Sequence, residues 1–273
     1  MQHTQDQGVS EAIGFILIFS MVVLGIGLVS LYGYPVLAQQ QTQADVRNME
    51  QTLIVLQNDI KSLCYKNVPY KETSLKVGGG SLGMFNTSLT SQYFSIGYWN
   101  QATLTFDYII REFHPGMLKY EADASDAVIA LENGGVIQRQ ELQTGSSMLA
   151  EPRWFYDDET KTLVVYFIAL NASELHSRNG IGVIKLQHDI AKDNFTEIHF
   201  PSAYDVYVNY SADPDISFET AWENYLINSV GMEKLNSPSN NPDPLDLSVI
   251  FNFRKINVEK LVIKQYEIKV LSL

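Results

Sequence analysis

Hydrophobic residues follow one another almost without interruption from Ala12 to Leu31, where only Ser20 and Ser30 are polar. As an α-helix, this stretch would be about 30 Å long, which matches the hydrocarbon core of a bilayer. A secretory signal peptide has a shorter apolar region and a basic start, and no Lys or Arg precedes residue 47. We therefore expect a membrane-spanning helix over about residues 12–37, with a buried core helix as the alternative.

The pattern changes to that of an amphipathic helix over residues 38–64, which we interpret as a stalk. Hydrophobic residues recur there at alternating spacings of three and four, as on one face of a packed helix. This seam consists of Val46, Met49, Leu53, Leu56, Ile60 and Leu63. Pro35 removes a backbone donor and crowds the preceding turn, so we expect a kink there. The seam packs either against the protein's own head or against helices of other copies, and the pattern leaves both open.

Strand patterns dominate after Cys64. Segments with β-branched and aromatic residues, separated by turn signals, indicate strands; they cover 92–99, 102–113, 116–122, 126–142, 153–170, 181–187, 196–200, 205–211, 247–253 and 259–273. Asn133-Gly134 and the loop 156–162 predict hairpins, and the glycine-rich segment 78–83 predicts a flexible segment or a turn. One amphipathic helix is expected over 217–230. The expected class is α+β, with a mostly antiparallel, β-sandwich-like head over residues 65–273.

Composition narrows the class of protein. The chain has 273 residues, 45% of them hydrophobic, and a net charge of -12 with a pI near 4.8. This acidity argues against nucleic acid as a partner, since a nucleic acid requires a basic face. The single cysteine, Cys64, excludes a disulfide within the chain.

The sequence contains no pattern that predicts catalysis, a metal site or a cofactor site. The five histidines lack metal-ligand spacing. His188 and Asp189 are adjacent in an expected loop, where a solvated pair is the simpler interpretation. The carboxylates of Asp157 and its neighbours are expected at a solvated hairpin tip, with calcium as the alternative. We therefore expect a protein that is not an enzyme.

Four Asn-x-Ser/Thr sequences are acceptors for N-glycosylation, at Asn86, Asn171, Asn194 and Asn209. About two would be expected by chance in a chain of this length and composition. The excess favours a head on the outside of the cell.

The stretch "GVSEAIGFILIFSMVVLGIGLV", Gly8 to Val29, resembles the N-terminus of archaeal type IV pilins and pilin-like proteins, which carry a class III signal peptide. The following helix looks like that of a methanogen-type group of such proteins. The resemblance implies that 1–8 is a hydrophilic leader, that a prepilin peptidase cuts between Gly8 and Val9, and that 9–64 is the N-terminal helix. Gln7 stands where the family usually has a charged residue, so a retained leader stays open as an alternative.

Glu11 lies at the start of the apolar helix, where a carboxylate interacts favourably with the unpaired N–H groups and the helix dipole. If the leader is removed, Glu11 can also pair with the new α-amino group of a neighbouring copy and so offset its desolvation. Whether it caps its own helix or makes this pair stays open.

The resemblance implies a subunit, of the minor kind, of an archaeal type IV pilus-like surface filament. Its expected partners are membrane lipid, the prepilin peptidase and other copies or other pilins. Its expected location is the cell membrane, crossed once, with an extracellular head for adhesion or assembly contacts. The alternative is a membrane-anchored extracellular binding or envelope protein that does not polymerise.

Overall fold

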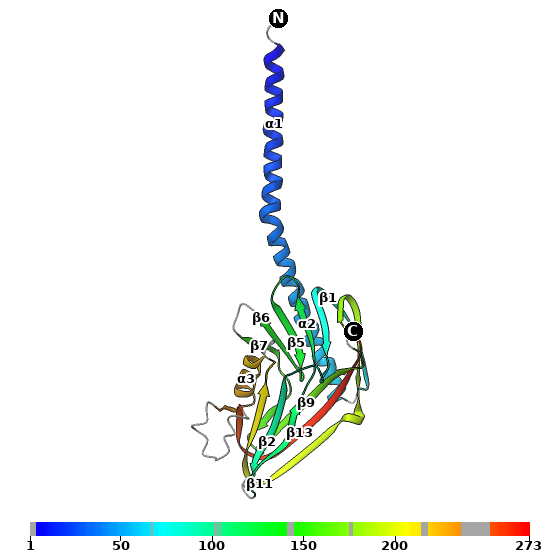
Figure 1. Cartoon of the computed structure of the whole chain (residues 1–273), viewed down its shortest axis with the longest axis vertical. Coiled ribbons are helices and arrows are strands. Elements are labelled where there is room, and N and C mark those ends of the chain that lie inside the picture. Colours follow the sequence, from blue (N-terminus) through cyan, green and yellow to red (C-terminus); the bar gives the residue numbers. More distant parts are fainter. Residues whose placement is uncertain are drawn as a thin grey trace. The chain divides into compact units, whose positions relative to one another are not determined.

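The computed structural model describes residues 4–66, 68–100, 103, 105–140, 145–174, 177–213, 218–235 and 252–273, with the backbone alone at 4–11 and 140. The described chain forms two compact units, Met1–Asp45 and Val46–Leu273. The first unit is helical. The second combines the C-terminal part of a long helix with a β-sheet and one further helix, so the fold class is α+β, as predicted (Figure 1).

The helices are α1 (Thr4–Leu28), α2 (Tyr34–Tyr65) and α3 (Glu219–Asn228), with a π-helical turn at Val29–Gly33 and a short 3-10 helix at Ile190–Lys192. The strands are β1 (Tyr70–Phe85), β2 (Tyr93–Asn100), β3 (Thr105–Phe113), β4 (Met117–Ala122), β5 (Ala127–Glu132), β6 (Gly135–Gln140), β7 (Ser146–Ala150), β8 (Phe155–Asp157), β9 (Thr162–Ala172), β10 (Ser177–His188), β11 (Asn194–Ser211), β12 (Glu233–Lys234) and β13 (Phe253–Ser272).

The π-helical turn lies where Pro35 was expected to disturb the helix. Proline has no N–H to pair with the carbonyl four residues earlier, and its ring crowds that carbonyl. The backbone responds with a wider turn, in which the N–H of Tyr34 donates to the carbonyl of Val29. Helical structure therefore continues through the proline into α2.

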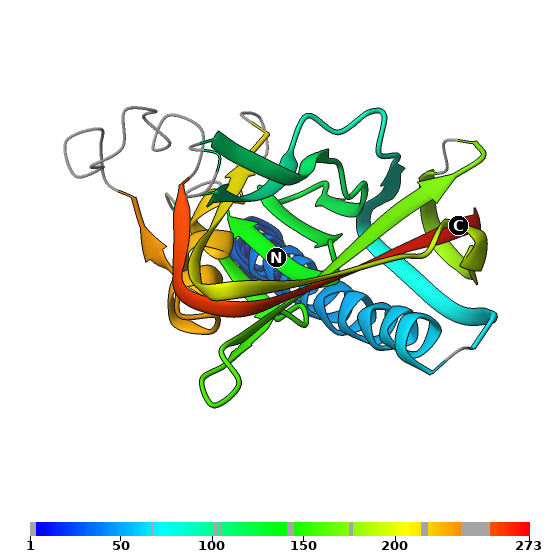
Figure 2. The same cartoon turned by 90° about the horizontal axis from the view of Figure 1, so that it is seen from below.

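The described strands join in one 13-stranded sheet, in the order β3-β2-β11-β13-β10-β1-β4-β5-β6-β7, with β8, β9 and β12 attached through β9 and β13. Within this sheet β9 and β13 form the one parallel pair, over eleven matched positions from Thr162 to Ala172. The long strands β11 and β13 run beside each other along the sheet (Figure 2). The sheet is therefore mostly antiparallel.

Two hydrophobic cores lie within the second unit. One joins the seam of α2 to side chains of β1, β4, β5 and β10, and the other joins α3 to β2, β9 and β11. Strands β9 and β13 contribute to both, because Leu163 and Leu261 lie in one core while Leu170 and Ile268 lie in the other. These two strands connect the cores and make the second unit one packed body.

The hairpin prediction at Asn133-Gly134 is confirmed: both residues have positive φ, 46° and 75°, and join β5 to β6. The loop between β8 and β9 is a hairpin as well. The turn predicted at Gly78–Gly83 is wrong, because these residues belong to β1, whose register with β10 shifts between Val77 and Leu82. A Cβ on Gly80 would lie 2.2 Å from the carbonyl oxygen of Glu121, so glycine here permits close strand packing.

Candidate functional site

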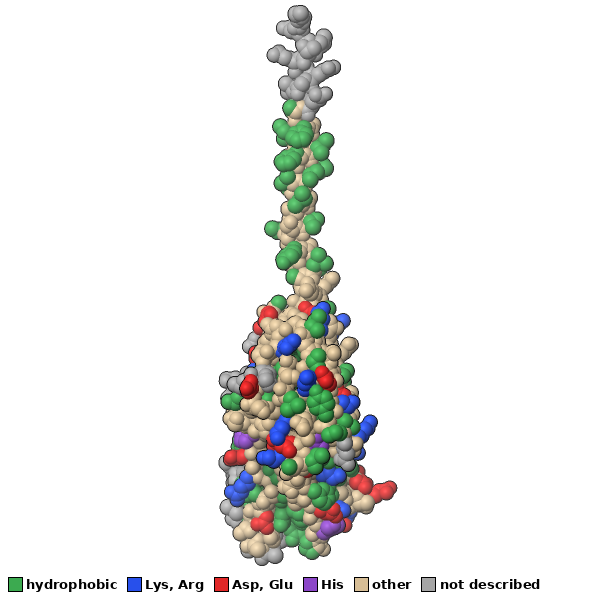
Figure 3. All heavy atoms as spheres, turned by 90° about the vertical axis from the view of Figure 1, so that its right-hand side faces the viewer, with side chains coloured by type: hydrophobic (Ala, Val, Ile, Leu, Met, Phe, Trp, Pro, Cys, Tyr) green, Lys and Arg blue, Asp and Glu red, His purple; other side chains and the backbone are tan. Residues whose placement is uncertain are grey.

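The apolar helical segment has no packing partner within the described chain. Large side chains from Ile13 to Leu37 are more than half exposed, with Phe15 at 70% and Met21 at 76%. Figure 3 shows these hydrophobic side chains along the helix, and residues 12–44 carry no charge. Among the described helices, one is long and apolar enough to cross a membrane, and it contains this segment.

The predicted cleavage point and the predicted assembly residue lie within α1, which begins at Thr4, before both of them. Gly8, Val9 and Glu11 belong to the helical backbone of α1. The side chains of these residues lie outside the part of the chain that is described. The roles predicted for Gly8, Val9 and Glu11 therefore stay predictions.

The seam of α2 is buried within the second unit. Five of its residues are at most 1% exposed and Val46 is 8% exposed. Their neighbours are hydrophobic side chains of the sheet, including Leu118, Leu131 and Leu186. These six residues therefore pack against the protein's own head, which is one of the two alternatives that the sequence left open.

Polar contacts fix α2 in one position on the sheet. The buried amide of Gln57 donates to the carbonyls of Gly134, Ala150 and Glu151 at 2.7, 3.2 and 2.9 Å. Further along, the hydroxyl of Thr73 donates to Asp59. A buried amide that finds three acceptors specifies one rotation and one axial position of the helix, because any other would leave the amide unsatisfied.

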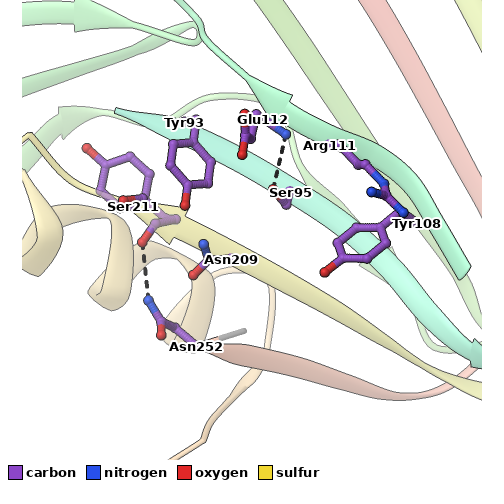
Figure 4. A pocket seen from close by; sticks show the side chains of 9 residues that line it. Tyr93, Ser95, Tyr108, Arg111, Glu112, Asn209, Ser211 and Asn252 are labelled. Carbon is purple, nitrogen blue, oxygen red and sulfur yellow. Dashed lines mark hydrogen bonds between the residues drawn. The ribbon is translucent and has the colours of Figure 1, made fainter. Parts of the chain in front are cut away.

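A polar pocket of about 460 Å³ lies on the outer face of β2, β3 and β11 (Figure 4). The uncharged polar residues that line it are Ser95, Asn209, Ser211 and Asn252. Three tyrosines, Tyr93, Tyr108 and Tyr210, and one pair of opposite charges, Arg111 and Glu112, complete the lining. The volume is in the range of small-molecule sites.

A β-bulge gives this pocket its charged residues. Phe94 pairs with Phe113 and Ile96 pairs with Ile110, so Arg111 and Glu112 together stand opposite Ser95. Glu112 has a φ of 50°, and its N–H donates to the Ser95 hydroxyl at 3.2 Å. Successive side chains of a regular strand point to opposite faces, whereas a bulge redirects them. No sequence signature distinguishes this bulge, so the pocket could not be predicted from the sequence.

A buried carboxyl group connects three elements and the residue before β2 near this region. Glu132, at the end of β5, accepts hydrogen bonds from the Trp222 indole at 3.0 Å and the Gln92 amide at 3.1 Å, and another from Tyr210. Burial raises the pKa of Glu132 from 4.5 to about 7, although the three hydrogen bonds oppose the rise. Tyr210 points from β11 into the core, and its own pKa is raised by burial and by Glu132.

The four glycosylation sequences differ in their surroundings. Asn86 and Asn171 are held by hydrogen bonds: Asn86 donates to and accepts from the backbone of Ala172, and Asn171 accepts from Thr87. Asn209 is 9% exposed in the pocket. Asn194, the first residue of β11, is exposed. Asn194 is therefore the most accessible of the four acceptors.

The pair His188-Asp189, predicted to be solvated, is not. His188 is 6% exposed at the end of β10, and its Nε2 lies 2.8 Å from Asp193, while Asp189 pairs with Lys269 at 2.6 Å. The histidine is buried because its ring packs against Tyr266. Within the described ranges, no group of three or more His, Cys, Asp or Glu residues could hold a metal ion.

These features define the class: a β-rich head joined to an apolar helix that is long enough to cross a membrane. The chain belongs to a family described as "Family of unknown function (DUF7289)", whose model matches residues 7–271. The match includes both the apolar helix and the head. Comparisons with curated proteins and with solved structures found no match.

Proposed function

We propose that this protein is a non-enzymatic, minor subunit of a type IV pilus-like filament at an archaeal cell surface. Its apolar helix would anchor it in the membrane before assembly and pack with other subunits in the filament core. Its head would lie outside the membrane and make adhesive or assembly contacts. The size of the head, residues 65–273, favours a minor subunit over the main fibre.

The observation that carries the proposal is the exposure of the apolar helix. Its large hydrophobic side chains lack partners within the described chain, and a hydrophobic surface of this extent requires a bilayer or other protein. The resemblance of residues 8–29 to pilin N-termini favours a pilin-type helix over a simple membrane anchor. In a pilin, the same helix serves first the bilayer and then the filament.

The burial of the seam favours contacts between subunits that involve another part of the chain. Val46 to Leu63 pack on the protein's own head, so this face of α2 has no free hydrophobic surface to offer a neighbour. Filament contacts would then come from the helix before Val46, where residues 12–44 carry no charge. The N-terminal unit would assemble and the C-terminal unit would remain a separate head.

The mature N-terminus of the native protein tests the proposal. Mass spectrometry of protein purified from its own membranes should find a chain that begins at Val9. A chain that begins at Met1 or Gln2 would refute pilin-type processing. Restoring the charge of the family with Gln7→Lys is then expected to increase the cleaved fraction, while Gly8→Leu is expected to abolish cleavage.

Glu11 provides a second test, specific to assembly. If its carboxylate pairs with the α-amino group of a neighbouring copy, Glu11→Gln should still be processed and inserted but should form few filaments. Electron microscopy of shed filaments and a membrane pellet assay separate the two outcomes. Normal filaments from this variant would limit Glu11 to the first turn of its own helix.

The second candidate is a single-pass, membrane-anchored extracellular protein that does not polymerise. The observation that favours it is the residue before the cleavage point, Gln7, which differs from the usual charged residue of pilins. An intact leader together with a monomeric protein in nanodiscs would support it.

A further inference from the structure

The pocket between β2, β3 and β11 has features of a binding site. Its polar side chains come from three strands and from Asn252, and Figure 4 shows them facing a common space. The inward-facing neighbours of these residues, such as Phe94, Ile96 and Val208, fill the hydrophobic core. The outer face of the same strands is therefore held rigidly by the core beneath it.

The bulge of β3 contains an unfavourable backbone conformation. Glu112 adopts a left-handed conformation, which is unfavourable for a residue other than glycine and is often found at ligand sites. Its result is that two side chains of opposite charge, Arg111 and Glu112, lie at the rim of the pocket. The charges cancel, so the rim favours neither a strongly anionic nor a strongly cationic ligand.

Asn209 lies at the centre of the lining in Figure 4. It is 9% exposed, and its side-chain amide makes no hydrogen bond to another described residue. An amide offers donors and an acceptor side by side, a pattern that matches two adjacent hydroxyl groups. A buried amide that finds no protein partner gains most from a ligand that supplies both.

The aromatic residues of the lining complete this chemistry. Tyr108 carries the guanidinium of Arg111 over its ring at 4.2 Å from the centroid, which fixes the orientation of both side chains. Tyr93 contributes a second half-buried ring and hydroxyl to the pocket. Sugar rings present C–H groups on their faces and hydroxyl groups at their edges, and this lining offers partners for both.

We propose that this pocket binds an uncharged saccharide. Asn209 would bind adjacent hydroxyl groups, Glu112 and Arg111 would bind hydroxyl groups at the rim, and Tyr93 and Tyr108 would contact the ring faces. The inference goes beyond the proposed function, because it applies equally to a filament subunit and to an anchored head that never polymerises.

The test uses the full chain in lipid nanodiscs, since glycoside detergents would compete for the site. The probes are D-glucose, D-galactose, D-mannose, N-acetyl-D-glucosamine and their common disaccharides at millimolar concentration, with binding measured by saturation-transfer NMR and calorimetry. Inorganic phosphate is included as an anionic probe. At least one neutral sugar should bind saturably and more tightly than phosphate.

Two substitutions locate the binding site. Asn209→Ala and Glu112→Gln should each weaken sugar binding at least tenfold, while the thermal unfolding of each variant verifies the fold. Asn194→Ala is the matched control, because it removes an exposed asparagine from the other end of the same strand and should bind as the wild type does. No binding by any sugar, tighter binding of phosphate, or binding unaffected by both pocket substitutions would overturn the proposal.

Discussion

Glu132 should make the stability of the head decrease as the pH rises from about 4.5 to about 7. The folded protein holds this carboxyl group in the core, where burial raises its pKa from 4.5 to about 7. Below about pH 4.5 the group is protonated in folded and unfolded chains alike, and its contribution to the free energy of unfolding is fully present. Between the two pKa values the unfolded chain releases the proton and the folded protein keeps it, so unfolding becomes easier.

The size of the effect follows from the pKa difference. One pKa unit corresponds to about 1.4 kcal/mol, so the change from 4.5 to about 7 amounts to about 3 kcal/mol across the interval. For a unit of this size, that corresponds to a decrease in melting temperature of roughly 6–12 °C. The carboxyl group is fully buried, so solvent screening does not reduce the figure.

Replacement of Glu132 by glutamine removes the titration and keeps the shape of the side chain. The Glu132→Gln variant should lose most of this pH dependence, because glutamine does not titrate. Its absolute stability should also be lower, because the amide NH2 group would face one of the donors from Trp222, Tyr210 and Gln92. Thermal unfolding of the full chain in nanodiscs, followed by near-ultraviolet circular dichroism between pH 4.5 and 8, measures the difference.

The control for Glu132→Gln is Glu121→Gln, which removes the same charge from an exposed position on the neighbouring strand β4. This variant should retain the wild-type pH dependence. Equal pH dependence in the wild type and in Glu132→Gln would refute the reasoning. A wild-type stability that is higher at pH 7 than at pH 4.5, with the increase still present in Glu132→Gln, would attribute the dependence to other groups.

Two further predictions concern packing and modification. Leu53→Ala should reduce the free energy of unfolding, measured by chemical denaturation, by about 2–5 kcal/mol, because it leaves a cavity beneath α2. The control Val55→Ala changes a half-exposed residue of the same helix and should reduce it by less than about 0.5 kcal/mol. Similar losses in the two variants would contradict the burial of the seam. Peptide mapping of the native protein by mass spectrometry should find a glycan on Asn194 and none at the other three acceptor sequences, and an unmodified Asn194 beside a modified buried acceptor would contradict this order of accessibility.

Several features of the fold could be predicted because neighbouring residues specify them. The three-and-four spacing from Val46 to Leu63 predicted the six hydrophobic seam residues that α2 buries, whereas Gln57, also buried on this helix, lies outside that spacing. Asn133-Gly134 predicted its hairpin, since few residue pairs tolerate two positive φ angles. The apolar run from Ala12 predicted a helix that could cross a membrane. In each case the signal lies within a few turns of chain.

Long-range strand pairing determines the features that local sequence patterns did not predict. Gly78–Gly83 formed part of a strand, because β4 approaches closely enough at Gly80 to exclude a side chain. The pocket exists because the pairing of β2 with β3 slips by one residue and redirects Arg111 and Glu112. A local pattern cannot report on a partner strand whose position it does not specify.

Hydrophobic periodicity is a local property of the chain, and it was sufficient to divide this protein into an apolar N-terminal helix, an amphipathic continuation and a β-rich head. The folded structure was needed to show what the amphipathic helix packs against, that the carboxyl group of Glu132 is buried, and that Asn209 faces a pocket. These outcomes depend on contacts between residues far apart in sequence, such as Gln57 with Gly134 and Trp222 with Glu132. The burial and hydrogen bonding that determine their energies exist only once the distant segments have come together.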